Sequence, residues 1–277
     1  MHQFITIFEL SIPSWTILAL FGVFLCWFLF YFRSRTLGYD YREIFNFFVY
    51  GMPVGFIGAT STQYITIFFT GSNQDIGFDG SMTVTGAIIS LCIYAYVYSR
   101  WILKLNPLAF MDQIAFTFPL TILVGRIGCL FEGCCYGHAH DLENYSFFTM
   151  QVSHYEPASV AYQHYIHNGL DTMQTVWNLP LMMVLASFIV LVGAEVFYKY
   201  RIKLKLPNGF VALITLWLYS ALRLVIENFR LEDKIELVPF NPWQTIVFFI
   251  FVFSTVSLVV LTTNIIKINV KNKVPLS

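Results

Sequence analysis

The segment from residue 125 to residue 138 concentrates residue types that can bind a charged ligand. It reads Gly-Arg-Ile-Gly-Cys-Leu-Phe-Glu-Gly-Cys-Cys-Tyr-Gly-His. Each glycine costs a helix interior about 1 kcal/mol relative to alanine, so the segment predicts irregular backbone whose amides can approach a phosphate. Arg126 begins the segment, and its planar guanidinium suits a phosphodiester. The alternative is that Arg126 only reaches the membrane interface and the glycines only let helices pack closely.

A second polar set lies further along the chain, at Tyr219, Arg223, Glu227 and Arg230. Spacings of four, four and three residues place these side chains on one face of a helix. Arg223 is followed by three apolar residues, and a charge within a membrane costs about 2.5–3.5 kcal/mol on insertion scales. Glu227 can neutralise Arg223, and Arg230 adds a second cation. This face is therefore either a ligand-binding stripe or a structural ion pair.

Cysteine and histidine residues suggest a rival site. Cys134 and Cys135 could bind zinc together with His138 and His140. Adjacent cysteines are awkward ligands and the spacing matches no common zinc site, so no metal is predicted. A disulfide involving Cys129, or a free thiol that carries a lipid, stays open on an oxidising outer face.

The composition indicates what must position these residues. Of the 277 residues, 57% are hydrophobic and 12% are charged, against roughly 25% charged in an average soluble domain. A soluble chain of this length could not hide so much apolar surface from water. The chain is therefore predicted to be an integral membrane protein.

The lengths of the apolar stretches predict an all-α polytopic fold with about seven transmembrane helices. A helix needs roughly 20 apolar residues to cross the hydrocarbon. Stretches of this size run at about 12–32, 44–69, 83–103, 108–125, 175–198, 209–227 and 243–266.

Basic residues set the predicted orientation. Most of the 16 Lys and Arg residues fall on one side of a seven-span arrangement, which the positive-inside rule makes cytoplasmic, with the N-terminus outside and the C-terminus inside. These are Arg33, Arg35, Arg42, Arg100, Lys104, Lys199, Arg201, Lys203, Lys205, Lys267, Lys271 and Lys273. Residues 1–277 are predicted to form a single transmembrane domain with an outer polar loop at about 126–173.

Both motifs resemble those of the prolipoprotein diacylglyceryl transferases of bacterial inner membranes. That family's loop begins Gly-Arg-Ile/Leu-Gly-Asn and ends in an aromatic residue and glycine, as 125–129 and 136–137 do here. Its later helix reads Tyr-Gly-x-x-Arg-Phe-x-x-Glu-x-x-Arg, matched at 219–230. Seven spans with the same orientation also fit the family. Smaller similarities extend the resemblance over most of the chain, at Gly55, Gly58, Ala59, Gln174 and Gln244.

Several positions depart from the family's pattern. The loop asparagine is Cys129, and the His-Gly-Gly segment appears as Thr85-Gly86-Ala87. An expected arginine is Thr60, and an expected glutamate is Trp177. A threonine hydroxyl is a poor base at neutral pH, so the base must come from elsewhere; the candidates are Glu227, Glu132 and the histidines of the outer loop.

The resemblance implies transfer of a diacylglyceryl group from phosphatidylglycerol to a lipobox cysteine of a prolipoprotein, with release of glycerol-1-phosphate. It implies catalytic roles for Arg126, Arg223 and Glu227, and substrate binding by a partly overlapping set: Arg126, Gly128, Gly137, Tyr219 and Arg230. The expected partners are phosphatidylglycerol, the signal-peptide region of a prolipoprotein and membrane lipids. No cofactor or nucleic acid is expected, and the active site should face outward from the inner membrane.

Two other functions remain open from the sequence. One is a paralogue that binds phospholipid headgroups or uses a different acceptor, which the replaced histidine and asparagine favour. The other is a small-solute transporter, which the glycine-rich segment and the membrane arginines favour. No internal repeat supports the transporter alternative.

The predicted orientation can be tested with reporter fusions. A reporter placed after Lys203 should behave as cytoplasmic, and one placed between residues 138 and 170 as external, because the basic connections stay inside. Enzymatic activity of a paired phosphatase and β-galactosidase reporter would measure this. The reverse pattern would contradict the seven-span arrangement.

Overall fold

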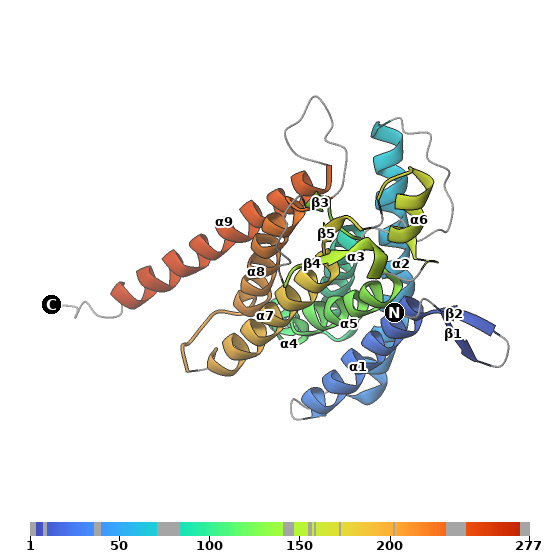
Figure 1. Ribbon diagram of the computed structural model, residues 1–277. Helices are drawn as coiled ribbons and strands as arrows, with labels where there is room; N and C mark the ends of the chain where they lie inside the picture. Colours follow the sequence, from blue (N-terminus) through green and yellow to red (C-terminus); the bar gives the residue numbers. More distant parts are fainter. Residues whose placement is uncertain are drawn as a thin grey trace. The chain divides into compact units, whose positions relative to one another are not determined.

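A computed structural model gives the arrangement of the chain (Figure 1). It describes residues 4–7, 10–35, 40–70, 84–140, 147–154, 157, 159–171, 173–201, 203–230 and 242–271. Most of these residues are helical. The helices are α1 Ser14–Arg35, α2 Tyr41–Thr70, α3 Val84–Val97, α4 Pro107–Ile114, α5 Thr117–Glu132, α6 Val160–His167, α7 Leu179–Tyr200, α8 Phe210–Glu227 and α9 Pro242–Lys271.

Two small sheets and two short helical turns complete the described elements. The strands β1 Phe4–Ile7 and β2 Leu10–Pro13 form an antiparallel hairpin before α1. A three-stranded antiparallel sheet has the order β3-β5-β4, with β3 Ala139–His140, β4 Thr149–Gln151 and β5 Thr175–Trp177. A π-helix, Tyr98–Ile102, continues α3, and a 3₁₀ turn, Val152–His154, follows β4.

The helices confirm an all-α polytopic membrane protein. Among the described residues, six segments are long and apolar enough to cross a bilayer: Thr16–Arg33, Tyr41–Ser61, Pro107–Glu132, Leu179–Tyr200, Phe210–Glu227 and Gln244–Thr263. A shorter apolar helix, Gly86–Ile102, lies where the span at 83–103 is predicted. The seven-span count and the orientation stay predictions.

The predicted span at 108–125 differs most from the structure. It consists of two helices, α4 and α5, separated at residues 115 and 116. Pro119 explains the break, because its ring clashes with the carbonyl four residues earlier and it has no N–H to donate. Beyond that break α5 continues to Glu132, although the glycines predict irregular backbone from Arg126. A helix satisfies its own backbone groups, and that requirement outweighs glycine propensity in a membrane.

Contacts divide the chain into two compact units. The first comprises Met1–Cys26, Pro119–Gly193 and Leu218–Gln244; the second comprises Trp27–Phe118, Ala194–Trp217 and Thr245–Ser277. The first unit has a small core of Val152, Ala161, Tyr165 and Val176, all nearly or completely buried. This core joins the three-stranded sheet to α6, so the region predicted as a polar loop contains folded structure.

An aromatic cluster forms the core of the second unit. The Phe47 ring lies 5.2 Å from the Tyr94 ring, 5.4 Å from the Tyr98 ring and 5.2 Å from the Phe110 ring. Phe30 packs edge-on to Phe110 at 6.0 Å. Aromatic pairs in such geometry contribute about 0.5–1.5 kcal/mol each beyond their buried area. Together these rings hold α1, α2, α3 and α4 against one another.

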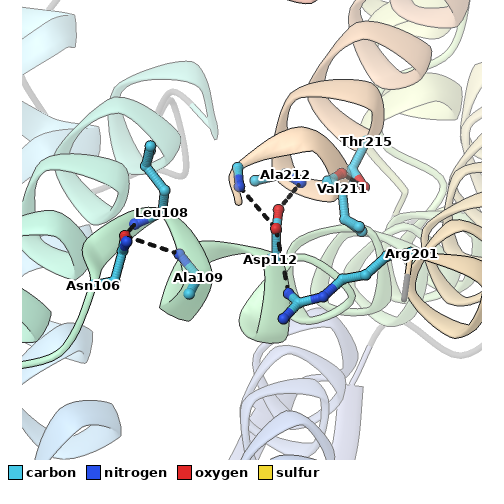
Figure 2. Close-up of polar contacts among 9 residues, drawn as sticks. Asn106, Leu108, Ala109, Asp112, Arg201, Val211, Ala212 and Thr215 are labelled. Atoms are coloured by element: carbon cyan, nitrogen blue, oxygen red, sulfur yellow. Dashed lines mark hydrogen bonds and ion pairs between the residues drawn. The ribbon is translucent and has the colours of Figure 1, made fainter. Parts of the chain in front are cut away.

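Asp112 on α4 is a buried carboxylate that the sequence analysis did not single out. Figure 2 shows its side chain pointing at the start of α8, where it accepts hydrogen bonds from the amides of Gly209 at 2.8 Å and Ala212 at 2.9 Å. Arg201 Nη1 lies 3.4 Å from its Oδ2. The first amides of a helix lack intrahelical partners, and a carboxylate at this end also complements the helix dipole. Asp112 therefore fixes where α8 begins.

We expect Asp112→Ala to destabilise the protein far more than a matched change at an exposed cap. Removing Asp112 leaves buried amides and Arg201 unpaired, at a cost of about 3–5 kcal/mol in the free energy of unfolding. Asn106 caps α4 by accepting from the amides of Leu108 and Ala109, but it is exposed, so Asn106→Ala should cost only about 1 kcal/mol. Thermal unfolding in detergent would measure both, and equal losses would contradict the capping role of Asp112.

Candidate functional site

The last turns of α8 carry a buried carboxylate between two guanidinium groups. Arg223 Nη2 lies 2.8 Å from Glu227 Oε2, and Arg230 Nη1 lies 3.1 Å from Glu227 Oε1. The Glu227 side chain is 1% exposed, that of Arg223 13% and that of Arg230 32%. The helical spacing predicted from the sequence thus brings these three side chains together. Arg223 also donates from Nη1 to the sulfur of Met183 on α7, at 3.2 Å.

Arg126 on α5 belongs to the same group of charges. Its positive charge acts on Arg223, as does that of Arg230. Tyr219, which is 8% exposed, lies close enough to act on both Arg126 and Arg223. Three guanidinium groups therefore belong to one group of charges, and two of them, those of Arg223 and Arg230, pair with the buried carboxylate of Glu227. Such an excess of positive charge in a low-dielectric setting favours binding of an anion.

The chain leaves α5 through a tight turn with unusual backbone angles. Gly133 has φ = 68° and Cys135 has φ = 59°; the second is a left-handed conformation that non-glycine residues adopt mainly where surrounding structure enforces it. Gly137 then pairs with Arg230 as an isolated antiparallel bridge. A Cβ atom on Gly137 would collide with the Phe229 carbonyl just after α8 and would lie 2.7 Å from the Cβ of Trp177. Glycine is required there so that the turn can approach the end of α8.

Several amides of this turn donate to carbonyl groups of the protein itself. Gly133 and Cys134 donate to the Cys129 carbonyl at 3.0 and 3.3 Å, and Gly137 donates to the Trp177 carbonyl at 2.8 Å. Gly128 lies inside α5, buried in the helix. The substrate-binding role expected of Gly128 and Gly137 stays a prediction. Among the described residues of the site, the guanidinium groups carry the capacity to bind an anion.

Three thiols gather beside Arg126. The sulfur atoms of Cys129, Cys134 and Cys135 all lie within 4.8 Å of one another, and Arg126 Nη1 lies 3.9 Å from Cys129 Sγ. Hydrogen bonds from the Cys129 and Cys134 thiols, aided by the charges of Arg126 and Arg230, hold the pKa of Cys135 well below its usual value. The pKa of Cys134 is raised, because its thiol hydrogen bonds to Cys129 and Cys135 and because it is buried. All three cysteines are free thiols.

His138 contacts the segment that follows α8. Its Nδ1 lies 3.1 Å from the Phe229 carbonyl, and its ring stacks on that of Phe229 with 6.5 Å between centroids. The backbone amide of His138 donates to the same carbonyl at 3.1 Å. His140 is the last residue of strand β3. Neither histidine belongs to the group formed by the three cysteine thiols.

Comparison with known proteins agrees with the motifs at this site. The sequence pattern of the family described as "Prolipoprotein diacylglyceryl transferase" matches residues 2–260. The chain is 27% identical over 279 residues to the phosphatidylglycerol–prolipoprotein diacylglyceryl transferase of Clostridium novyi (strain NT), covering 96% of this chain and 95% of that protein. The chain belongs to this family.

Other family members give similar comparisons. A protein of the same name from Dehalococcoides mccartyi (strain CBDB1) is 25% identical over 208 residues, covering 74% of this chain and 71% of that protein. One from Clostridium tetani (strain Massachusetts / E88) is 32% identical over 112 residues, covering 38% of this chain and 43% of that protein. Membership of the prolipoprotein diacylglyceryl transferase family thus rests on nearly the whole chain.

The positions that depart from the family pattern have distinct surroundings. Trp177 packs on Phe229 with 4.6 Å between ring centroids, so it supports the end of α8. Thr60 donates to the Phe56 and Ile57 carbonyls of its own helix. Thr85 lies in α3, but its side chain is outside the described residues, as are residues 141–146 of the predicted outer loop. Thr60 and Thr85 both belong to the second unit.

Sequence reasoning missed two contributors to this site. Met183 is 1% exposed and accepts a hydrogen bond from Arg223, but an apolar residue inside an apolar helix carries no sequence signal. Phe229 offers its carbonyl and ring to His138. Its position between Glu227 and Arg230 is the only signal that could have pointed to it.

The two ion pairs at Glu227 predict an ordered series of stability losses. Glu227→Leu leaves Arg223 and Arg230 facing Arg126 without an anion, so the free energy of unfolding should fall by about 3–5 kcal/mol. Arg223→Leu should cost less, because Arg230 still pairs with Glu227. The double variant Arg223→Leu with Glu227→Leu should regain part of the loss. Thermal unfolding in detergent measures each step.

A matched control for this series is Asn228→Ala, because Asn228 is exposed and adjacent to Glu227. It should change stability by no more than about 0.5 kcal/mol. If Arg223→Leu proved more damaging than Glu227→Leu, the shared carboxylate would not be what balances the guanidinium groups.

Proposed function

We propose that this protein transfers a diacylglyceryl group from phosphatidylglycerol to the lipobox cysteine of a prolipoprotein. The observation that carries this proposal is an excess of guanidinium charge: Arg223 and Arg230 pair with one buried carboxylate, and the charge of Arg126 acts on Arg223. Phosphatidylglycerol is anionic, and its phosphodiester matches a cluster with excess guanidinium charge. The names of the relatives in the same family support the transfer reaction over a transporter or a protein that only binds lipid.

Binding of the headgroup is assigned to Arg126 and Arg230. Arg126 has no carboxylate partner among the ion pairs of the described residues, so its charge is available to a ligand. Arg230 is more exposed than Arg223, with 32% of its side chain accessible against 13%. Tyr219 lies near Arg126 and Arg223 and supplies a hydroxyl to the same site. These groups would hold the phosphate at the membrane surface.

The chemical step follows from where charge develops. The thiolate of the lipobox cysteine attacks the glyceryl carbon that bears the phosphate ester, forming a carbon–sulfur bond as the carbon–oxygen bond breaks. Glycerol-1-phosphate leaves with the electron pair, and its oxygen gains negative charge in the transition state. Arg223 is placed to stabilise that charge without reorganising, because Glu227 and Met183 already fix its guanidinium.

Glu227 acts in this scheme as a positioning residue. Both of its oxygens lie within 3.1 Å of a guanidinium nitrogen. Its contribution is to orient Arg223 and Arg230. We place the reaction in the bacterial inner membrane with the site toward its outer face, as the distribution of basic residues in the sequence supports.

Substitution of Arg126 tests the headgroup assignment. Arg126→Ala should lower transfer of labelled diacylglycerol to a lipobox peptide by about 100-fold or more, as loss of one charge-stabilising donor does elsewhere. Arg126→Lys should restore only part of the rate, because an ammonium lacks the bidentate geometry. Arg100→Ala removes an exposed arginine of the second unit and should leave the rate unchanged.

The double variant Arg223→Leu with Glu227→Leu separates a structural from a functional role of the ion pair. Leucine at both positions removes the charges together and should leave a folded protein, yet transfer should remain lost because no leucine stabilises the leaving phosphate. Recovery of stability and activity together would overturn the catalytic assignment of Arg223.

A further inference from the structure

The three thiols beside Arg126 have a geometry that the proposed reaction does not use. The sulfur atoms of Cys129, Cys134 and Cys135 lie within 4.8 Å of one another. With metal–sulfur bonds of about 2.3 Å, three sulfurs in a trigonal plane are about 4.0 Å apart. Small side-chain rotations therefore suffice to bring the three sulfurs into one coordination sphere.

Two backbone features hold the thiols in this arrangement. Cys129 lies about one helical turn before the end of α5. Its carbonyl accepts hydrogen bonds from the amides of Gly133 and Cys134, at 3.0 and 3.3 Å. Cys135 sits in a left-handed conformation with φ = 59°, which costs about 1–3 kcal/mol unless the surroundings enforce it. The Gly137 bridge to Arg230 immediately afterwards supplies that restraint.

We propose that Cys129, Cys134 and Cys135 form a trigonal thiolate site for a monovalent thiophilic cation, Cu(I). Soft thiolate donors favour Cu(I) as well as zinc, but Cu(I) is satisfied by three sulfur ligands. Structural zinc sites have four protein ligands, whereas the group formed by the described residues consists of the three cysteines alone. The histidine pairing considered from sequence is replaced by Cys129, which the end of α5 brings to the turn.

Two features of the surroundings fit a metal better than a disulfide. Joining any two of the sulfurs would leave the third unpaired, whereas a trigonal cation uses all three equally. Three thiolates and one monovalent cation carry two negative charges, and Arg126 and Arg230 both place positive charge at Cys135. Arg126 Nη1, 3.9 Å from Cys129 Sγ, is also placed as an outer-shell donor to a ligand sulfur.

Occupancy of this site would oppose binding of the phospholipid headgroup. The cation replaces three thiol protons, and the resulting anionic complex lies beside the same arginines that are assigned to the phosphate. Cu(I) should therefore inhibit diacylglyceryl transfer. This consequence rests on the proposed function, whereas binding of the cation does not.

The binding test uses the whole protein in detergent, reduced with ascorbate and titrated with Cu(I) buffered by a chromophoric chelator. We expect one Cu(I) per chain and, by X-ray absorption, three sulfur neighbours at one distance. Changes to outer-shell groups cost about 10–100-fold in metal affinity, so Cys129→Ser, Cys134→Ser and Cys135→Ser should each cost more than about 100-fold. Cys92→Ser, a matched control in the second unit, should bind as the wild type does.

A second measurement needs no variant. Cu(I) should protect Cys135, the most exposed of the three cysteines, from alkylation by a maleimide in the wild-type protein. Tighter binding of Zn(II) than of Cu(I), two sulfur neighbours instead of three, or equal affinities for Cys135→Ser and Cys92→Ser would each overturn the proposal. Formation of a disulfide in place of binding would overturn it as well.

The activity measurement separates this inference from the proposed function. Cu(I) should slow transfer by the wild-type protein and should not slow transfer by Cys134→Ser. Stoichiometric binding in a protein that transfers no lipid would support the metal site and count against the transferase. Transfer that is indifferent to bound Cu(I) would overturn the inhibitory consequence.

Discussion

The carboxylate of Glu227, held between Arg223 and Arg230, is the interaction on which the rest of the site depends. Three guanidinium groups close together in a low-dielectric region repel one another, and each resists transfer out of water. One buried carboxylate with a guanidinium nitrogen within 3.1 Å of each oxygen reduces that penalty without cancelling the excess charge. The three guanidinium groups can therefore lie close together and still attract a phosphate.

The turn after α5 performs a complementary task, because it ties Arg126 to the end of α8. Gly137 pairs with Arg230, His138 hydrogen bonds to the Phe229 carbonyl, and Trp177 packs on the Phe229 ring. These contacts hold together two segments that lie about 90 residues apart in the chain, as the His138–Phe229 separation of 91 shows. The cluster is thus preorganised by backbone pairing as well as by charge, which is what stabilisation of a developing negative charge requires.

The same turn places the three cysteine thiols next to the arginines that are assigned to the phosphate. Arg126 is shared by the two, since its guanidinium lies 3.9 Å from Cys129 Sγ and its charge acts on Arg223. Where the family pattern has an asparagine, this chain has Cys129, and the helical end of α5 carries it to Cys134 and Cys135. A site that responds to soft metal ions can arise in this way without disturbing the arginines.

Much of this architecture could be predicted from the sequence, because hydrophobic length and helical periodicity are local properties. They sufficed for the membrane class, for most of the helices to within a few residues, and for the stripe of Arg223, Glu227 and Arg230, since residues three and four apart always share a helix face. Glycine content misled the prediction at 126–132, because the need to satisfy backbone groups outweighs local propensity in a membrane. Only the tertiary structure decided that Asp112 caps α8, that Met183 supports Arg223, and that the amides of Gly133, Cys134 and Gly137 donate within the protein. The spacing of Cys129, Cys134 and Cys135 in the sequence likewise does not show that their thiols meet. Their meeting depends on where α5 ends and on the left-handed backbone of Cys135. Both features are set by contacts with residues distant in the chain.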